Sequence, residues 1–115
     1  MPRAAEGAGG RRASASERVG AARLDDAATV LRALSHPARL RIVSLLSGGE
    51  LCVKRLEEIL GMPQPSVSQH LTRLRYAGII RAERRGHLVC YRLQDWPAAA
   101  IAVAALEAAG RTKGV

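Results

Sequence analysis

The stretch Leu51–Leu93 reads LCVKRLEEILGMPQPSVSQHLTRLRYAGIIRAERRGHLVCYRL. Apolar residues at helical spacing predict a short helix from Val53, or roughly Cys52, to Leu60, which ends at a Gly-Met-Pro turn. A second helix is predicted over Gln64–Ala77, with Ser, Gln, His, Thr and Arg side chains on its outward face. Two strands follow, Ile79–Glu83 and Leu88–Leu93, joined across a turn rich in Arg and Gly. This order of elements predicts a helix-turn-helix followed by a β-wing, which places one helix in the major groove of DNA.

The flanking sequence predicts three more helices. Apolar spacing favours helices over Ala21–Leu34 and Ala38–Ser47, with Pro37 suited to a first helical turn. A mostly Ala helix is expected over Trp96–Ala109, too apolar to remain solvated, so a second copy of the chain should cover it together with helix 21–34. The expected fold class is therefore mainly α with a small β-hairpin, a winged helix-turn-helix of five helices and two strands.

The domain organisation follows from composition. Residues 1–19 are Gly, Ala, Ser and Arg with hardly any large apolar side chain, which predicts a disordered basic arm. Residues 20–110 should form one DNA-binding and dimerisation domain, and residues 111–115 a flexible tail. The chain has no Phe and one Trp, so its core must be small, and an oligomer would help to bury it.

The net charge of +8 is concentrated where the helix-turn-helix is predicted. Residues 61–93 contain six arginines and one glutamate, whereas residues 24–60 contain five bases and five acids. Residues 1–23 add five arginines against two glutamates. Such a distribution is typical of a protein that neutralises a polyanion.

Several classes of protein are disfavoured. No apolar run approaches the ~20 residues that span a bilayer, and the N-terminus lacks the apolar segment of a secretory signal, so we expect no membrane partner. Two cysteines do not form a disulfide scaffold, and we expect a cytoplasmic protein. No nucleophile, base and orienting group occur together, so we do not expect an enzyme.

Four phrases occur in order: LRALSHPARL (31–40), ELCV (50–53), QPSVSQHL (64–71), and RRG (84–86) leading to YRL (91–93). Together they resemble the ArsR/SmtB family of winged-helix repressors over about residues 22–106. The resemblance implies a homodimeric repressor on a double-stranded DNA operator, usually released by a metal ion, a metalloid or a thiol modification. A dimer should bind an imperfect palindrome.

The helix 64–77 is the expected reading element. Val67, Leu71 and Leu74 repeat at helical spacing and should face the core, which turns the polar side chains outward. Gln pairs with adenine, and Arg with guanine or phosphate. The resemblance places base contacts at Ser66, Ser68 and Gln69, and Pro65 replaces a residue that is often polar. The DNA-binding candidates are Gln64, Ser66, Ser68, Gln69, His70, Thr72 and Arg73.

Two details of this region carry further expectations. His70 could approach the DNA backbone or be a half-buried structural histidine. In the wing, Arg84, Arg85 and His87 are candidates for the minor groove or for phosphates. Strand alternation predicts that Val89, Tyr91 and Leu93 face inward, whereas Leu88, Cys90 and Arg92 face outward.

The response to an inducer is open at the sequence level. Arsenic-sensing relatives carry Glu-Leu-Cys-Val-Cys, but here Lys54 occupies the second thiolate position. Zinc-sensing relatives use His, Asp and Glu on the final helix, which here offers only Asp95 and Glu107. No cofactor is required, and As(III), Sb(III) or a soft divalent metal is the expected inducer. Its candidate ligands are Cys52 and Cys90, expected to lie too far apart to share an ion within one chain. A thiol redox switch, a protein without such an inducer, and a winged-helix interaction module are the alternatives.

Overall fold

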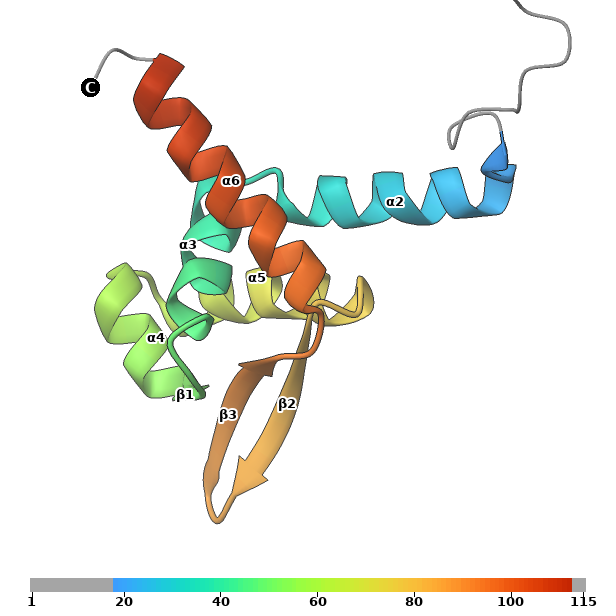
Figure 1. Ribbon diagram of the computed structural model, residues 1–115. Coiled ribbons are helices and arrows are strands. Elements are labelled where there is room, and N and C mark those ends of the chain that lie inside the picture. Colours follow the sequence, from blue (N-terminus) through green and yellow to red (C-terminus); the bar gives the residue numbers. More distant parts are fainter. Residues whose placement is uncertain (1–17, 113–115) are drawn as a thin grey trace, which may run out of the picture.

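The computed structural model describes residues 18–112. Helices α3, α4 and α5 pack above a small sheet, and α2 and α6 extend away from this body in different directions (Figure 1). The predicted winged helix-turn-helix is confirmed. The elements in chain order are α2 (Ala21–Leu34), α3 (Pro37–Leu46), β1 (Leu51–Cys52), α4 (Val53–Leu60), α5 (Gln64–Tyr76), β2 (Ile80–Arg85), β3 (Leu88–Leu93) and α6 (Trp96–Thr112).

The ends of the predicted domain differ from the observed ones. Most of the predicted arm, residues 1–17, and the last residues of the predicted tail, 113–115, lie outside the described residues. Arg111 and Thr112, predicted to belong to that tail, instead continue α6. The helix extends because its Ala-rich sequence has a high helix propensity through Ala109, and Gly110 is accommodated near its end.

The core is small and built from aliphatic side chains, as the composition requires. Val67, Leu71 and Leu74 of α5 are each at most 1% exposed, which confirms the predicted inward face of this helix. They pack with side chains of α3, α4, β2 and α6 in one cluster. Its other fully buried large members are Ile42, Val43, Leu46, Leu56, Ile79 and Ile80.

A third strand, absent from the prediction, joins the wing to the helices. β1 pairs with β3 in antiparallel register, Leu51 opposite Tyr91 and Cys52 opposite Cys90, so the sheet has the order β1-β3-β2. The helix predicted from Val53, or roughly Cys52, begins at Val53, and Cys52 is extended at the position that precedes α4. A strand of two residues is too short to produce the alternation that reveals strands in a sequence.

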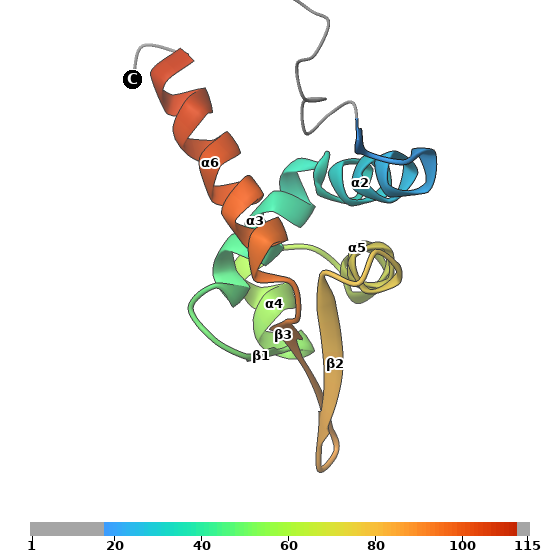
Figure 2. The same ribbon diagram turned by 45° about the vertical axis from the view of Figure 1, so that its right-hand side comes forward.

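Two turns with a glycine in the left-handed conformation position α5 and the hairpin of β2 and β3. Gly61 ends α4 in the left-handed conformation, with φ of 63°, which glycine adopts without steric cost. The chain then turns through Met62 and Pro63 into α5. Gly86, with φ of 65°, plays the same part in the hairpin between β2 and β3. The hairpin projects beyond the helices beside α5 (Figure 2).

Candidate nucleic-acid interface

Helix α5 presents a polar surface opposite its buried face. Gln69 and Arg73 are exposed, and Ser66, Ser68 and Thr72 are half-buried. The Thr72 hydroxyl donates to the Ser68 carbonyl oxygen at 2.9 Å, so this side chain is oriented by its own helix. A groove of about 400 Å³ runs along this surface. It is lined by Arg39, Gln64, Pro65, Ser68, Gln69, His70, Thr72 and Arg73. The structure thus brings together most of the predicted reading residues.

Arg39 of α3 is a member of this groove that the sequence prediction missed. Its Nε donates to His70 Nδ1 at 3.2 Å, and its Nη1 donates to the Ala33 carbonyl oxygen at 3.4 Å. Within residues 18–112, neither Arg39 nor Arg73 forms an ion pair with a carboxylate. Two guanidinium groups without a carboxylate partner therefore line the groove, which suits phosphate oxygens. In the sequence, the only sign that Arg39 belongs to this groove is its position near the start of a helix.

His70 is a half-buried part of the domain's framework. Its ring lies beside that of His36, with 4.4 Å between ring centroids, and His36 Nδ1 in turn accepts from the Ala38 backbone N–H. Burial lowers the pKa of His70, and the positive potential of His36 and Arg39 lowers it further. A neutral imidazole is consistent with Nδ1 as an acceptor for Arg39. Of the two alternatives that the sequence left for His70, these contacts are those of a half-buried structural histidine.

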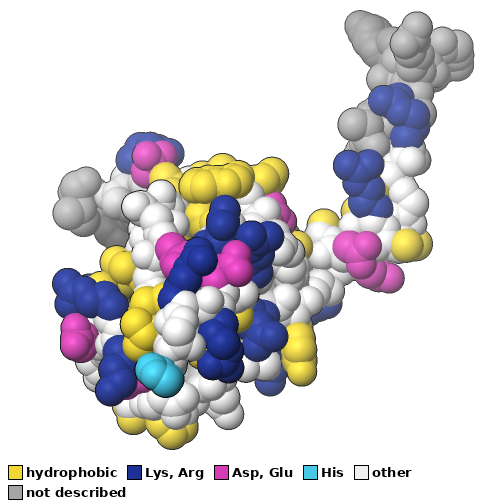
Figure 3. Space-filling model, turned by 90° about the horizontal axis from the view of Figure 1, so that it is seen from below, with side chains coloured by type: hydrophobic (Ala, Val, Ile, Leu, Met, Phe, Trp, Pro, Cys, Tyr) yellow, Lys and Arg dark blue, Asp and Glu magenta, His cyan; other side chains and the backbone are white. Residues whose placement is uncertain are grey.

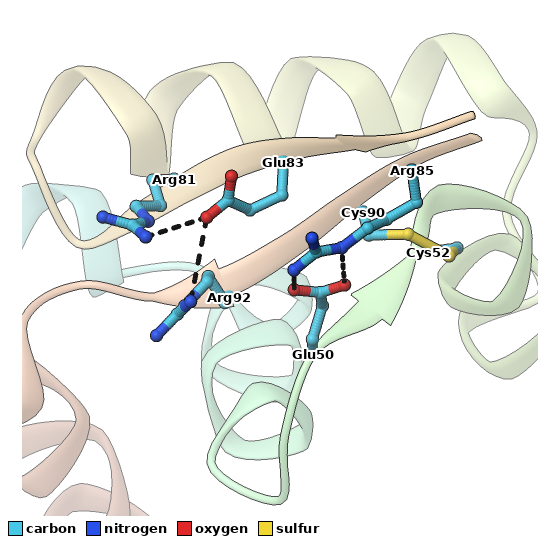
Figure 4. A network of polar contacts seen from close by, with 7 residues as sticks. All are labelled: Glu50, Cys52, Arg81, Glu83, Arg85, Cys90 and Arg92. Carbon is cyan, nitrogen blue, oxygen red and sulfur yellow. Dashed lines mark hydrogen bonds and ion pairs between the residues drawn. A yellow bond between two sulfur atoms is a disulfide. The ribbon is translucent and has the colours of Figure 1, made fainter. Parts of the chain in front are cut away.

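The wing carries the second group of predicted residues. Arg84, Arg85 and His87 are all exposed. Arg84 forms no ion pair among the described residues, whereas Arg85 does: its Nε and Nη2 donate to the two carboxylate oxygens of Glu50 at 3.0 and 2.9 Å (Figure 4). These hydrogen bonds hold the pKa of Glu50 below its usual value. Of the two wing arginines, the structure leaves only Arg84 without a competing carboxylate.

A single face of the sheet gathers most of the charges around the wing. Opposite residues of antiparallel strands point to the same side, and successive residues alternate. Glu83 sits between two arginines on this face: Arg81 Nη2 lies 2.8 Å and Arg92 Nη1 3.7 Å from its Oε1. Figure 3 shows basic side chains gathered on the wing side of the molecule, with acidic ones interleaved. The members of this outer face are Glu50, Cys52, Arg81, Glu83, Arg85, Leu88, Cys90 and Arg92.

The two cysteines confirm one prediction and correct another. Cys90 shares the predicted outer face with Leu88 and Arg92, yet it is only 1% exposed, since Cys52 of the neighbouring strand β1 is bonded to it. The expectation that Cys52 and Cys90 lie too far apart within one chain is wrong. They occupy opposite positions of β1 and β3 and form a disulfide (Figure 4). The unpredicted strand β1 accounts for the burial of Cys90 and for its closeness to Cys52.

The described residues hold few of the side chains that a metal site would need. Across residues 18–112, no three His, Cys, Asp or Glu side chains are grouped as a metal ion would require. Cys52 and Cys90 are the only cysteines of the chain, so one protomer cannot supply three thiolates. Lys54, which follows on α4, adds a positive charge beside this pair.

Helices α2 and α6 expose apolar side chains away from the reading surface. Leu24 and Leu31 of α2 are 56% and 54% exposed, and Ile101, Val103 and Leu106 of α6 are 39–45% exposed. A groove of about 560 Å³ lies between the two helices, lined on one side by Val30 and Leu31. Within residues 18–112, no helix combines the length and apolar composition needed to cross a membrane.

The described geometry is that of a winged helix-turn-helix DNA-binding domain, with α5 as the reading helix and β2–β3 as the wing. The sequence profile of the arsR family of bacterial regulatory proteins matches residues 36–82. The chain is 46% identical over 87 residues to the HTH-type transcriptional repressor SmtB of Mycobacterium tuberculosis. That alignment covers 76% of this chain and 64% of SmtB, less than two thirds of its length.

Solved structures agree with this match. The transcriptional repressor BigR of Xylella fastidiosa is 40% identical, with a TM-score of 0.66, over 72% of this chain and 85% of BigR. The homodimeric winged helix-turn-helix domain Mb0332 of Mycobacterium bovis is 30% identical, with a TM-score of 0.72, over 83% of this chain and 89% of Mb0332. The chain belongs to the arsR family, whose members are DNA-binding transcriptional regulators and not enzymes.

Proposed function

We propose that this protein is a homodimeric transcriptional repressor that binds a double-stranded operator through α5 and the wing. The observation that carries the proposal is the groove along α5, whose lining combines Ser68 and Gln69 with Arg39 and Arg73. Neither arginine has a carboxylate partner among the described residues. Polar side chains read base edges while guanidinium groups hold the flanking phosphates. We expect the protein to act in the cytoplasm, where bacterial DNA lies.

The dimer is supported by the exposed apolar side chains of α2 and α6. A second copy would cover Leu24, Leu31, Ile101 and Leu106, which otherwise remain in water at a cost of about 25 cal/mol per Å² of apolar surface. Mb0332, which has the same fold, is a homodimer. A two-fold dimer presents two α5 helices to successive major grooves, and its operator should be an imperfect palindrome with half-sites roughly one helical turn apart.

Selection of bound duplexes from a random pool tests the proposal. The expected result is a palindromic consensus whose affinity falls steeply with salt. The rival function is a winged-helix module that binds only other proteins. A protein that binds no duplex would support that rival, and one that binds all duplexes equally would contradict a sequence-specific repressor.

The inducing signal is proposed to act on the thiols of Cys52 and Cys90. One candidate is oxidation to the disulfide. The second is a thiophilic metalloid or metal, As(III), Sb(III) or a soft divalent ion, for which the two cysteines of neighbouring strands would supply thiolate ligands once reduced. Because the chain offers only two thiols, we expect weaker affinity for such a ligand than a three-thiolate site would give. Release of the selected duplex by arsenite or cadmium, abolished in Cys52→Ser, would distinguish this candidate from oxidation.

A further inference from the structure

The disulfide lies beside the Glu50–Arg85 ion pair (Figure 4). Among the described residues, this is the ion pair that joins a wing arginine to the segment before β1. Glu50 precedes β1 by one residue and Cys52 ends it, so both side chains project from the same face. The Glu50–Arg85 pair spans β3 from β1 to β2, next to the sulfur atoms (Figure 4). A displacement of β1 relative to β3 therefore also moves Glu50 and alters its ion pair with Arg85.

We propose that Cys52 and Cys90 form a reversible disulfide that controls whether Arg85 is available to bind a DNA phosphate. In the disulfide form, β1 is bound covalently to β3, and Glu50 holds Arg85. In the dithiol form, Glu50 is released and Arg85 turns to DNA. This inference rests on the proposed function of operator binding, and it gives the direction of regulation: the reduced protein represses and the oxidised protein releases DNA.

Without the disulfide, β1 is held only weakly on β3, which supports a link between the thiol state of the cysteines and the Glu50–Arg85 pair. The strand has two residues, and the chain enters it from Gly48 and Gly49, which restrict the backbone little. Two unbonded thiols need more room than two bonded sulfur atoms, so reduction separates the strands at this position. The Glu50–Arg85 pair is exposed, with 29% and 55% of the two side chains accessible, and such pairs are readily exchanged. A DNA phosphate competes for Arg85 once Glu50 is no longer fixed.

The exposure of the two cysteines sets the order of the chemical steps. Cys90 is 1% exposed and Cys52 is half-buried, so a reagent reaches Cys52 first. The Cys52 thiolate attacks one sulfur of a low-molecular-mass disulfide and expels a thiolate. The Cys90 thiolate then attacks the Cys52 sulfur of the mixed disulfide and expels the second thiolate. The two cysteines lose two electrons and two protons, and the reagent gains both as two thiols. Cytosolic disulfides are usually of this transient, sensing kind.

The expected effect follows from the number of phosphates that the oxidised protein no longer binds. One arginine per wing gives two per dimer, so the slope of log affinity against log salt should be smaller by about 1.8 in the oxidised form. If this electrostatic contribution vanishes near ~1 M salt, the affinity at ~0.15 M falls roughly 30-fold. Random and selected duplexes should lose affinity alike, because a phosphate contact carries no sequence information.

The experiment measures binding of a pool-selected duplex and of a scrambled duplex over a salt series. The full chain is used after treatment with dithiothreitol or with oxidised glutathione, and intact mass verifies its thiol state. Glu50→Gln should still form the disulfide, yet bind with the slope of the reduced protein in both states. Cys52→Ser, in which Ser suits the helix-capping position, should remain in the high-affinity state. Glu58→Gln, which removes the same charge on α4 next to Arg55, should keep the full redox response.

Three results separate the inference from the proposed function. Equal salt slopes for the reduced and oxidised wild-type protein would overturn the inference while leaving DNA binding intact. A full redox response in Glu50→Gln would overturn the role assigned to Arg85. If the reduced protein selects no duplex at all, the proposed function itself fails, and the inference falls with it.

Discussion

Arg39 of α3 donates a hydrogen bond of 3.2 Å to His70 of α5, and this contact joins the two helices. The same guanidinium reaches the Ala33 carbonyl oxygen, so it bridges the end of α2 as well. Because Arg39 also lines the groove along α5, a side chain that holds the domain together is available to DNA. The protonation state of His70 therefore bears on the stability of the domain beside its reading surface.

The depressed pKa of His70 predicts a loss of stability in mild acid. The unfolded chain binds a proton at His70 near pH 6.5, and the folded protein does so only at lower pH. The unfolded state therefore holds more protons between these values, and the free energy of unfolding falls as the pH drops below about 6.5. Urea unfolding of the wild type and of His70→Gln from pH 8 to pH 5 measures this. The dependence should be weaker in His70→Gln, and unchanged in His87→Gln, which alters an exposed wing residue.

Gln69 is exposed and lines the groove along α5, so it should contribute to sequence discrimination. Gln69→Ala should lower the preference for the selected duplex over a scrambled one by roughly 1–3 kcal/mol, the value of one bidentate base contact. Fluorescence anisotropy with both duplexes measures the difference. Gln94→Ala is the control, because Gln94 follows the wing and contacts Gly78. Undiminished discrimination in the Gln69 variant would show that another face of α5 reads the bases.

Arg84 and Arg85 should contribute affinity without discrimination. Under reducing conditions, the double variant Arg84→Ala with Arg85→Ala should weaken binding to selected and scrambled duplexes by the same factor. Its salt slope should decrease by about 0.9 for each phosphate that the variant no longer binds. Arg111→Ala, at the far end of α6, removes a similar charge and should leave the slope unchanged. A selective effect on one duplex would instead place a wing arginine on base edges.

The apolar faces of α2 and α6 should hold the dimer. Sedimentation at micromolar concentration should give about twice the chain mass of 12.3 kDa. Ile101→Glu with Leu106→Glu places two charges on this surface and should yield monomers, because burying unpaired carboxylates is costly. Leu88→Glu, on the exposed wing, should remain dimeric. A wild-type monomer that binds DNA tightly would contradict the proposed assembly.

The sequence predicted the helical part of this fold because helical periodicity is visible over ten or more residues. Val67, Leu71 and Leu74 mark the inward face of α5 without ambiguity, and every polar candidate on this helix except Ser66 lines its groove. The outward direction of Cys90 was also predictable from strand alternation. Its burial was not, because that depends on β1, whose pairing joins residues 38 positions apart.

Long-range polar contacts escaped the sequence for a related reason. Arg85 and Glu50 are 35 positions apart, and Arg39 and His70 are 31 apart. Each pair forms because the fold brings two elements together, and nothing local marks the partner. The composition revealed an excess of arginine, but it could not show which arginines form ion pairs with carboxylates.

The position of β3 in the middle of the sheet divides the wing into two parts. β1 braces β3 only at Cys90 and Tyr91, whereas the turn and the residues beside it, Arg84 to Val89, pair with nothing but each other among the described strands. Insertions or deletions at the tip can therefore change the length of the wing without disturbing α4 or α5. The same changes near Cys90 would displace β1 and, with it, the start of α4. The tip is thus the part of this molecule where related repressors can vary their reach along DNA while keeping one common framework.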